Sequence, residues 1–153
     1  MSALFFWKDF MKIFIASDHG AFNEKQELAN YLKGKQEVID LGTYSIDSTN
    51  YPEWAKKLVE KVKAEKAVGI LLCGSGIGVS MTANRFSDIR AALCRDEDDA
   101  KMSRLHNNAN VLCLSGRRTP LELLKKITDT FLSTPFEGGR HQARIDMFNN
   151  LGE

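Results

Sequence analysis

Short apolar runs alternate with longer amphipathic segments along this chain, from Met11 to its carboxyl end. The short runs are rich in isoleucine, leucine and valine, which is typical of buried strands. The longer segments place apolar residues three or four positions apart, so each would form a helix with one buried face. The alternation therefore predicts repeated strand–helix units.

The predicted strands are 12–17, 37–41, 67–73, 89–94 and 110–115. The predicted helices are 23–32, 51–66, 79–85, 96–105, one that runs from Pro120 through Phe131, and a last one that carries Arg140 and Arg144. Because parallel strands need crossover connections, we expect an α/β fold: a three-layer, Rossmann-like domain with a five-stranded parallel sheet and helices on both faces. Residues 1–10 are treated as an N-terminal extension, expected to be poorly ordered, and residues 11–153 as one domain.

Composition narrows the classes of function. The formal net charge is +1, so no global field would recruit nucleic acid. No run approaches the roughly 20 apolar residues that a membrane span needs. The three cysteines lack the spacing of a disulfide framework, which favours a reducing compartment. We therefore expect a cytoplasmic protein with neither nucleic acid nor a membrane as a partner.

Ligands of parallel α/β sheets bind outside the carboxyl ends of the strands. Polar or reactive residues follow four of the predicted strands: Asp18-His19-Gly20, Cys73-Gly74-Ser75, Arg95-Asp96 and Gly116-Arg117. The candidate chemistry is therefore expected at one edge of the sheet.

The glycine-rich segment 74–78 joins a buried strand to a helix, so its backbone N–H groups could gather around one anion. Val79 stands where a P-loop would have its lysine, which favours an oxyanion or an enediolate over a nucleotide. Cys73 precedes this turn, near a helix N-terminus that would stabilise a thiolate. It is a candidate base, and the alternative is a buried structural cysteine. For Cys94 and Cys113 the structural interpretation is favoured.

Histidines and arginines supply further candidates. His19 and His106 lie at the ends of predicted elements, where an imidazole can act as acid or base; the alternative is a structural histidine. A metal site is not expected, because no two of the three histidines stand three or four residues apart and no cysteines are closely spaced. Arg117, Arg140 and Arg144 are candidates for holding a phosphate. The alternative is a solvated basic face.

Five motifs stand in order along the chain: Ser17-Asp18-His19-Gly20, Cys73-Gly74-Ser75-Gly76-Ile77-Gly78, Arg104-Leu105-His106-Asn107, Asn110-Val111-Leu112 and Gly138-Gly139-Arg140-His141. Together they resemble the type B ribose-5-phosphate isomerases, over the chain from Met11 to about the last helix. That family also includes galactose-6-phosphate isomerase subunits and allose-phosphate isomerases. The resemblance therefore indicates the reaction type more firmly than the sugar.

The resemblance implies that Cys73 is the base that takes the proton from C2 of the open-chain aldose. In one branch of the family a glutamate replaces this cysteine, but Val79 stands at the corresponding position here. The enediolate would be stabilised by the backbone amides of Gly74, Gly76, Ile77 and Gly78. Isomerisation through an enediolate needs a base, an acid and fixed donors but no cofactor.

The resemblance also assigns the remaining candidates. Ser75 would assist proton movement between the two oxygens, and His106 would open the furanose ring with help from Asp18. Asn107 would contact the sugar. The phosphate-binding set would be His19, Arg117, Arg140 and Arg144.

The presence of Cys73, His106 and Asn107 together favours ribose 5-phosphate and ribulose 5-phosphate as substrates, in the pentose phosphate pathway, because galactose-6-phosphate isomerase subunits tend to lose the His-Asn pair. The resemblance implies a homodimer, or a dimer of dimers, with active sites shared between subunits. Two alternatives stay open: an allose- or galactose-6-phosphate isomerase, and a non-catalytic sugar-phosphate-binding subunit.

Overall fold

A computed structural model describes residues 10–152. The N-terminal extension assigned to residues 1–10 lies outside the described residues, apart from Phe10. Within the described range, one parallel sheet has the strand order β2-β1-β3-β5-β4. Its strands are β1 (Lys12–Ser17), β2 (Glu37–Asp40), β3 (Val68–Cys73), β4 (Ala91–Leu93) and β5 (Val111–Ser115).

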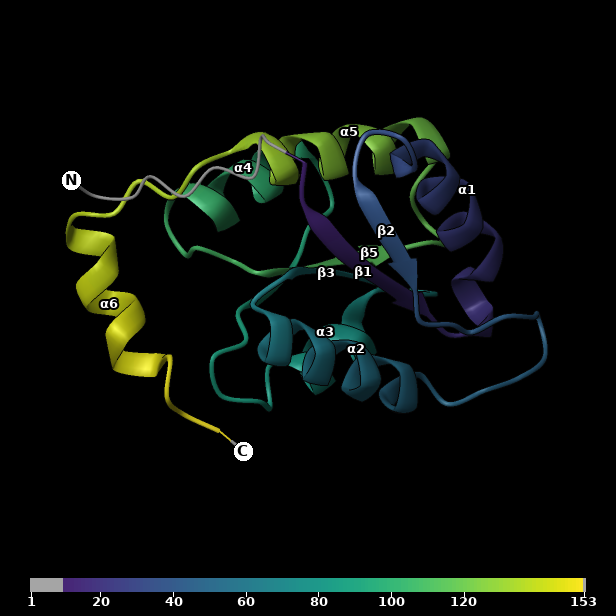
Figure 1. The fold of residues 1–153 in the computed structure, drawn as a ribbon, viewed down its shortest axis with the longest axis horizontal. Helices are drawn as coiled ribbons and strands as arrows, with labels where there is room; N and C mark the ends of the chain where they lie inside the picture. The colour runs from purple at the N-terminus through teal and green to yellow at the C-terminus, as the bar shows by residue number, and fades with distance from the viewer. Residues whose placement is uncertain (1–9, 153) are drawn as a thin grey trace.

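Helices cover both faces of this sheet (Figure 1). One face packs against α1 (Phe22–Leu32), α4 (Glu97–Leu105) and α5 (Leu121–Ser133). The other packs against α2 (Tyr51–Glu65) and α3 (Ile77–Ala83). Alternate residues of β1, β3 and β5 enter the two cores, which is why these central strands read as continuous apolar runs. The predicted three-layer α/β fold is confirmed.

The predicted and observed element ends differ by a few residues. The helix predicted to begin at residue 79 begins at Ile77, because Gly76 already turns the chain into it with a φ of +76°. The strand predicted over 89–94 shortens to Ala91–Leu93 at the sheet edge. Asp96 caps α4 by accepting the Asp99 N–H at 2.8 Å.

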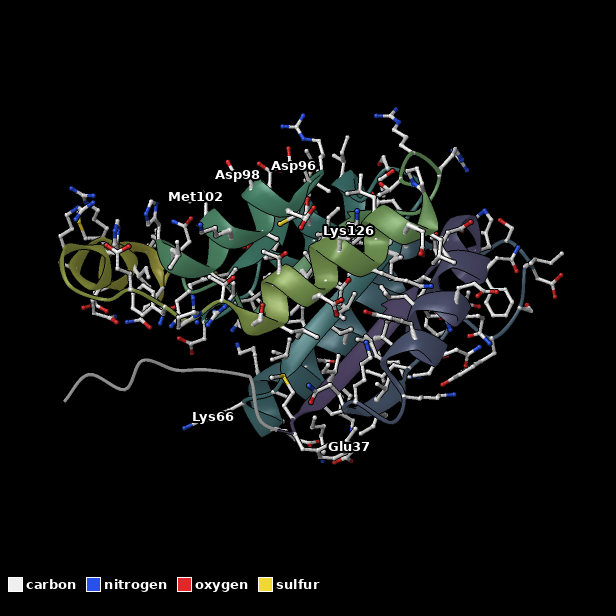
Figure 2. The ribbon with its side chains drawn as sticks, turned by 90° about the horizontal axis from the view of Figure 1, so that it is seen from above. Glu37, Lys66, Asp96, Asp98, Met102 and Lys126 are labelled. Atoms are coloured by element: carbon white, nitrogen blue, oxygen red, sulfur yellow. The ribbon has the colours of Figure 1, made fainter. Side chains whose placement is uncertain are left out.

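The last helix, α6 (Arg140–Phe148), stands beyond the two helical layers, at one end of the molecule (Figure 1). In Figure 2 it lies beyond the carboxyl end of α4, on which Asp98 and Met102 are labelled. Main-chain bonds hold it at both ends: the Glu137 N–H donates to Leu105 O at 3.0 Å, and the Asp88 N–H to Asn149 O at 2.8 Å.

No helix among residues 10–152 combines the length and apolar composition that crossing a membrane requires.

Candidate functional site

Cys73 is the last residue of β3, where the central strand gives way to the glycine-rich turn. Its Sγ accepts the backbone N–H of Gly76 at 3.1 Å, and only 5% of the residue is exposed. Gly76 can make this contact because its φ is +76° and a Cβ there would lie 2.9 Å from the Leu114 carbonyl carbon. The turn therefore aims a backbone N–H at the sulfur of this candidate base.

The turn that follows is shaped by side chains on its neighbours. The Ser75 Oγ accepts the Ile77 N–H at 3.2 Å, and the Ser115 hydroxyl donates to Gly74 O at 2.7 Å. Gly78 lies under the Tyr51 ring, which a Cβ at this glycine would approach to 2.5 Å. The N–H groups of the first helical turn have no intrahelical acceptor, so the start of α3 is suited to an anion.

Arg117 brings a positive charge to the same edge. A Cβ on Gly74 would lie 3.1 Å from the Arg117 Cζ, and one on Gly20 would lie 3.4 Å from the Gly74 nitrogen. Asp18, which is 8% exposed, accepts the Gly20 N–H at 2.9 Å. The loops after β1, β3 and β5 therefore meet, as the position of their motifs at the strand ends predicted.

His19 begins the short 3-10 helix η1 (His19–Ala21) and is oriented by the loop after β2. Its Nδ1 accepts the Thr49 N–H at 3.1 Å. Nδ1 is thereby fixed as an acceptor, which leaves Nε2 as the nitrogen that can donate to an anion.

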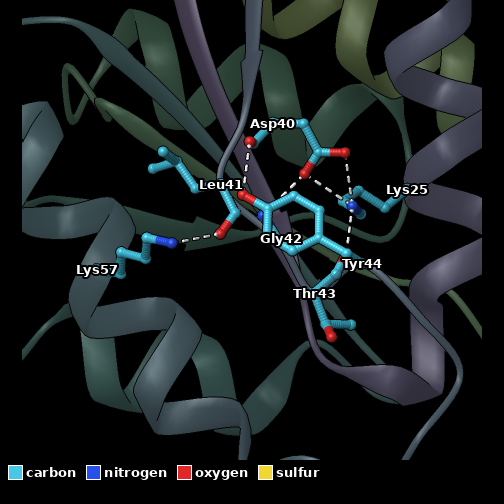
Figure 3. A network of polar contacts seen from close by, with 7 residues as sticks. All are labelled: Lys25, Asp40, Leu41, Gly42, Thr43, Tyr44 and Lys57. Atoms are coloured by element: carbon cyan, nitrogen blue, oxygen red, sulfur yellow. Dashed lines mark hydrogen bonds and ion pairs between the residues drawn. The ribbon is translucent and has the colours of Figure 1, made fainter.

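A buried lysine holds the loop after β2, and sequence reasoning missed it. The Lys25 side chain is fully buried, and its Nζ lies 2.7 Å from both carboxylate oxygens of Asp40 and from Thr43 O (Figure 3). Asp40 in turn accepts the Gly42 N–H, and Lys57 donates to Leu41 O. Burial lowers the pKa of Lys25, and the Asp40 carboxylate opposes that effect.

The other predicted site residues lie elsewhere in the chain. His106 ends α4, a helix that leaves the carboxyl edge of the sheet and returns toward its amino edge. Its nine residues span about 14 Å, which separates His106 from the Cys73 turn. Asn107 is exposed, and so are Arg140 and Arg144 on α6. A single chain therefore gathers Asp18, His19, Cys73, Ser75 and Arg117 at one place, with His106, Asn107, Arg140 and Arg144 at another.

His106 has two neighbours that sequence reasoning did not single out as site residues. The imidazoles of His106 and His141 are stacked, with ring centroids 4.2 Å apart. The Glu137 carboxylate lies 3.9 Å from His106 Nε2 and 3.5 Å from His141 Nε2. Burial, and then the charges of His106 and Arg140, lower the pKa of His141.

Arg104, two residues before His106, binds segments beside the end of α4, a role that its place in the motif did not reveal. Its fully buried guanidinium donates to Ala109 O at 2.7 Å, Thr134 O at 3.1 Å and Asn108 Oδ1 at 2.8 Å. Burial lowers the pKa of Arg104 to about 10. These bonds tie the end of α4 to the segments that flank β5 and α6.

The remaining cysteines lie in the core. Burial raises the pKa of Cys94 to about 12 and that of Cys113 well above its ordinary value. At neutral pH neither thiol can act as a base, which agrees with their structural interpretation.

The sequence and fold match known proteins over most of the chain. The family model described as Ribose/Galactose Isomerase matches residues 13–148. The ribose-5-phosphate isomerase B of Escherichia coli is 43% identical over 137 residues, which cover 88% of this chain and 92% of that protein. The crystal structure of a ribose 5-phosphate isomerase from Thermotoga maritima shares 55% identity with a TM-score of 0.89, covering 91% of this chain and 97% of its own. The type B ribose 5-phosphate isomerase of Trypanosoma brucei shares 39% identity with a TM-score of 0.88, covering 92% and 97%.

Proposed function

The chain belongs to the ribose/galactose isomerase family, and from this premise we propose that it interconverts ribose 5-phosphate and ribulose 5-phosphate through an enediolate, with Cys73 as the base. One observation carries the proposal: the Cys73 sulfur ends the central strand and accepts the Gly76 N–H at 3.1 Å, beside the loops of Asp18 and Arg117. The ribose-5-phosphate isomerase names of the relatives support this choice of sugar.

In the forward direction, the Cys73 thiolate removes the proton from C2 of the open-chain aldose. The C1 carbonyl oxygen then carries the negative charge of an enediolate, and N–H donors at the start of α3 stabilise it. Fixed donors of this kind are worth about 3 kcal/mol each in related chemistry. The Ser75 hydroxyl moves a proton between the two oxygens, and the Cys73 thiol returns its proton to C1 to give the ketose.

The phosphate and the closed sugar ring need residues that one chain holds apart. We infer that two copies complete each site, with His19 and Arg117 of one copy facing Arg140, Arg144, His106 and Asn107 of the other. Exposed apolar side chains beside the Cys73 turn support such a contact: Ile77 is 43% and Met81 68% exposed, four residues apart on α3. In this arrangement His106, assisted by Asp18, opens the ring before proton abstraction.

We place the protein in the cytoplasm, as one isomerase domain over residues 11–153 acting in the pentose phosphate pathway. Free thiols at all three cysteines support a reducing compartment.

Substitution of Cys73 tests the assignment of the base. Cys73→Ala should lower kcat about 10²- to 10⁴-fold because it removes the proton acceptor, while binding of ribose 5-phosphate, measured by calorimetry, stays close to that of the unmodified protein. Cys94→Ala is the matched control, since it removes a buried thiol outside the site, and it should keep its turnover. Unchanged turnover in Cys73→Ala would remove Cys73 as the base.

A panel of aldose phosphates separates the remaining functions. Ribose 5-phosphate should give a higher kcat/KM than allose 6-phosphate, whereas galactose 6-phosphate should react poorly. A preference for a hexose phosphate would assign the chain to the other branches of the family. Tight binding without turnover by the purified chain would identify a sugar-phosphate-binding subunit instead.

A further inference from the structure

The fold brings His106 beside Glu137 and His141, two neighbouring residues from a distant part of the sequence. Their ligand atoms all lie within 4.8 Å of one another. The main chain sets this geometry, because the Glu137 N–H donates to Leu105 O and so places the carboxylate beside the end of α4. Gly138 and Gly139 follow with φ values of +76° and +58°, a left-handed turn that brings His141 back to the same point.

The distances in this cluster are too long for hydrogen bonds. Glu137 oxygens lie 3.5 Å from His141 Nε2 and 3.9 Å from His106 Nε2, whereas N–H···O bonds span about 2.7–3.2 Å. Two ligands of a tetrahedral zinc ion, each about 2.0–2.1 Å from the metal, stand about 3.3 Å apart. The two Glu137 separations are therefore within about 0.2 and 0.6 Å of this value. The two imidazoles are stacked at an interplanar angle of 16°, so the His106 ring must turn before both nitrogens can face one ion.

An unpartnered nitrogen points to a ligand independently. The His141 side chain is only 7% exposed, and its Nε2 is buried without a hydrogen-bond partner among the described residues. Buried polar atoms nearly always have partners, because leaving one without costs free energy. The unpartnered atom is the one that faces Glu137.

We infer that His106 Nε2, His141 Nε2 and the Glu137 carboxylate bind one Zn²⁺ ion, with the fourth position open to water. Two imidazoles and a carboxylate are a donor set that zinc uses in proteins. Solvent reaches the cluster, because 39% of the His106 side chain and 48% of Glu137 are exposed. His141 is held in place, and the half-exposed His106 ring turns to bring its lone pair onto the ion.

Zinc at this site engages the imidazole that the proposed function assigns to ring opening. A metal-bound Nε2 can neither accept nor donate a proton, so zinc should inhibit conversion of the ring form of the sugar. This consequence, unlike binding itself, rests on the proposed function and on the role of His106 within it.

Calorimetric titration of the purified, chelator-treated full chain with Zn²⁺ tests the site. We expect one ion per chain and an affinity at least about tenfold weaker in Glu137→Gln and His141→Ala. Asp146→Asn is the matched control, because it neutralises an exposed carboxylate on α6, the helix that carries His141. The Asp146 carboxylate accepts a bond from Gln142 and is not part of the cluster. Cys73→Ala should retain binding, which separates this site from a contact between zinc and the catalytic thiol.

Glu137→Gln is the decisive variant, since its side chain is half exposed and its loss spares the packing of α6. Absence of stoichiometric binding, or binding that Glu137→Gln leaves unchanged, would overturn the site. Turnover of ribose 5-phosphate with and without Zn²⁺ tests the consequence: inhibition should weaken in Glu137→Gln and reverse with a chelator. Binding without inhibition would overturn the inhibitory role, and a chain that turns over no sugar would still report on the site through calorimetry.

Discussion

At the scale of single residues, the three thiols show how position decides chemistry. Cys73 and Cys113 point to the same face of the sheet, yet only Cys73 stands at the last position of its strand, next to backbone N–H groups. Cys113 sits in the middle of β5 with atoms on all sides, and Cys94 lies in the opposite core. A displacement of a few residues along a strand thus separates a candidate base from an inert side chain.

Alkylation should distinguish these thiols in the folded protein. With a pKa of about 12, Cys94 is about 10⁻⁴ thiolate at pH 8, and burial also raises the pKa of Cys113 well above its ordinary value. We expect iodoacetamide to modify Cys73 first and to leave the other two largely intact. Mass spectrometry of peptides measures the three rates, and denatured protein should react at all three. Equal rates at Cys73 and Cys94 in the folded chain would contradict these environments.

Residue order indicated that Cys73, His19 and Arg117 would lie at one edge of the sheet, because each stands at or just after the end of a parallel strand. It did not reveal His141 and Glu137, whose meeting with His106 depends on a main-chain bond between distant segments. Along the chain, the histidines stand too far apart to indicate a metal site. Tertiary structure adds His106 to the Glu137–His141 pair, which no spacing along the chain shows.

At the scale of elements, the loop after β2 depends on a charge carried by a helix. Lys25 shares a face of α1 with Leu28, Ala29 and Leu32, all buried, so it reaches through the core side of the helix to Asp40. In the sequence, Lys25 stands three residues before Leu28, and Asp40 ends the next strand. These two positions could have indicated a buried ion pair. Only the structure shows that the Lys25 ammonium also donates to the Thr43 carbonyl and so holds the loop after β2 (Figure 3).

Lys25→Met should destabilise the protein by about 3 kcal/mol, because it leaves Asp40 and a carbonyl group without their buried cation. Urea unfolding measures the loss. The double variant Lys25→Met/Asp40→Asn should recover part of it, since the stranded negative charge is removed as well. Lys126→Met is the control: Lys126 projects outward from α5 (Figure 2), so its loss should change stability by less than about 0.5 kcal/mol. Equal effects of the two lysines would refute the role of Lys25.

At the scale of the whole molecule, the periodic pattern was enough for the fold but not for the site. Burial on both faces makes β1, β3 and β5 apolar throughout, so their number and direction could be read from the sequence. The motifs of Cys73 and His106 stand in one linear order, and that order does not say whether they meet within a chain or between chains. Because α4 separates the His106 motif from the Cys73 turn, we propose that the two motifs meet between chains.

Mixing two inactive variants tests whether copies complete one another. In a pair made from Cys73→Ala and His106→Ala/Arg144→Ala chains, one site receives Cys73 from the double variant together with His106 and Arg144 from its partner, and the other site lacks all three. Random pairing after joint refolding makes about half of the pairs hybrid, each with one of two sites intact, so the mixture should recover about one-quarter of the unmodified activity. A mixture of Cys73→Ala and Cys73→Ser chains cannot complement and sets the background. Activity at that background, in a mixture whose hybrid pairs are detected by mass spectrometry, would mean that each chain holds a complete site. A rearrangement within the chain would then have to bring His106 to Cys73.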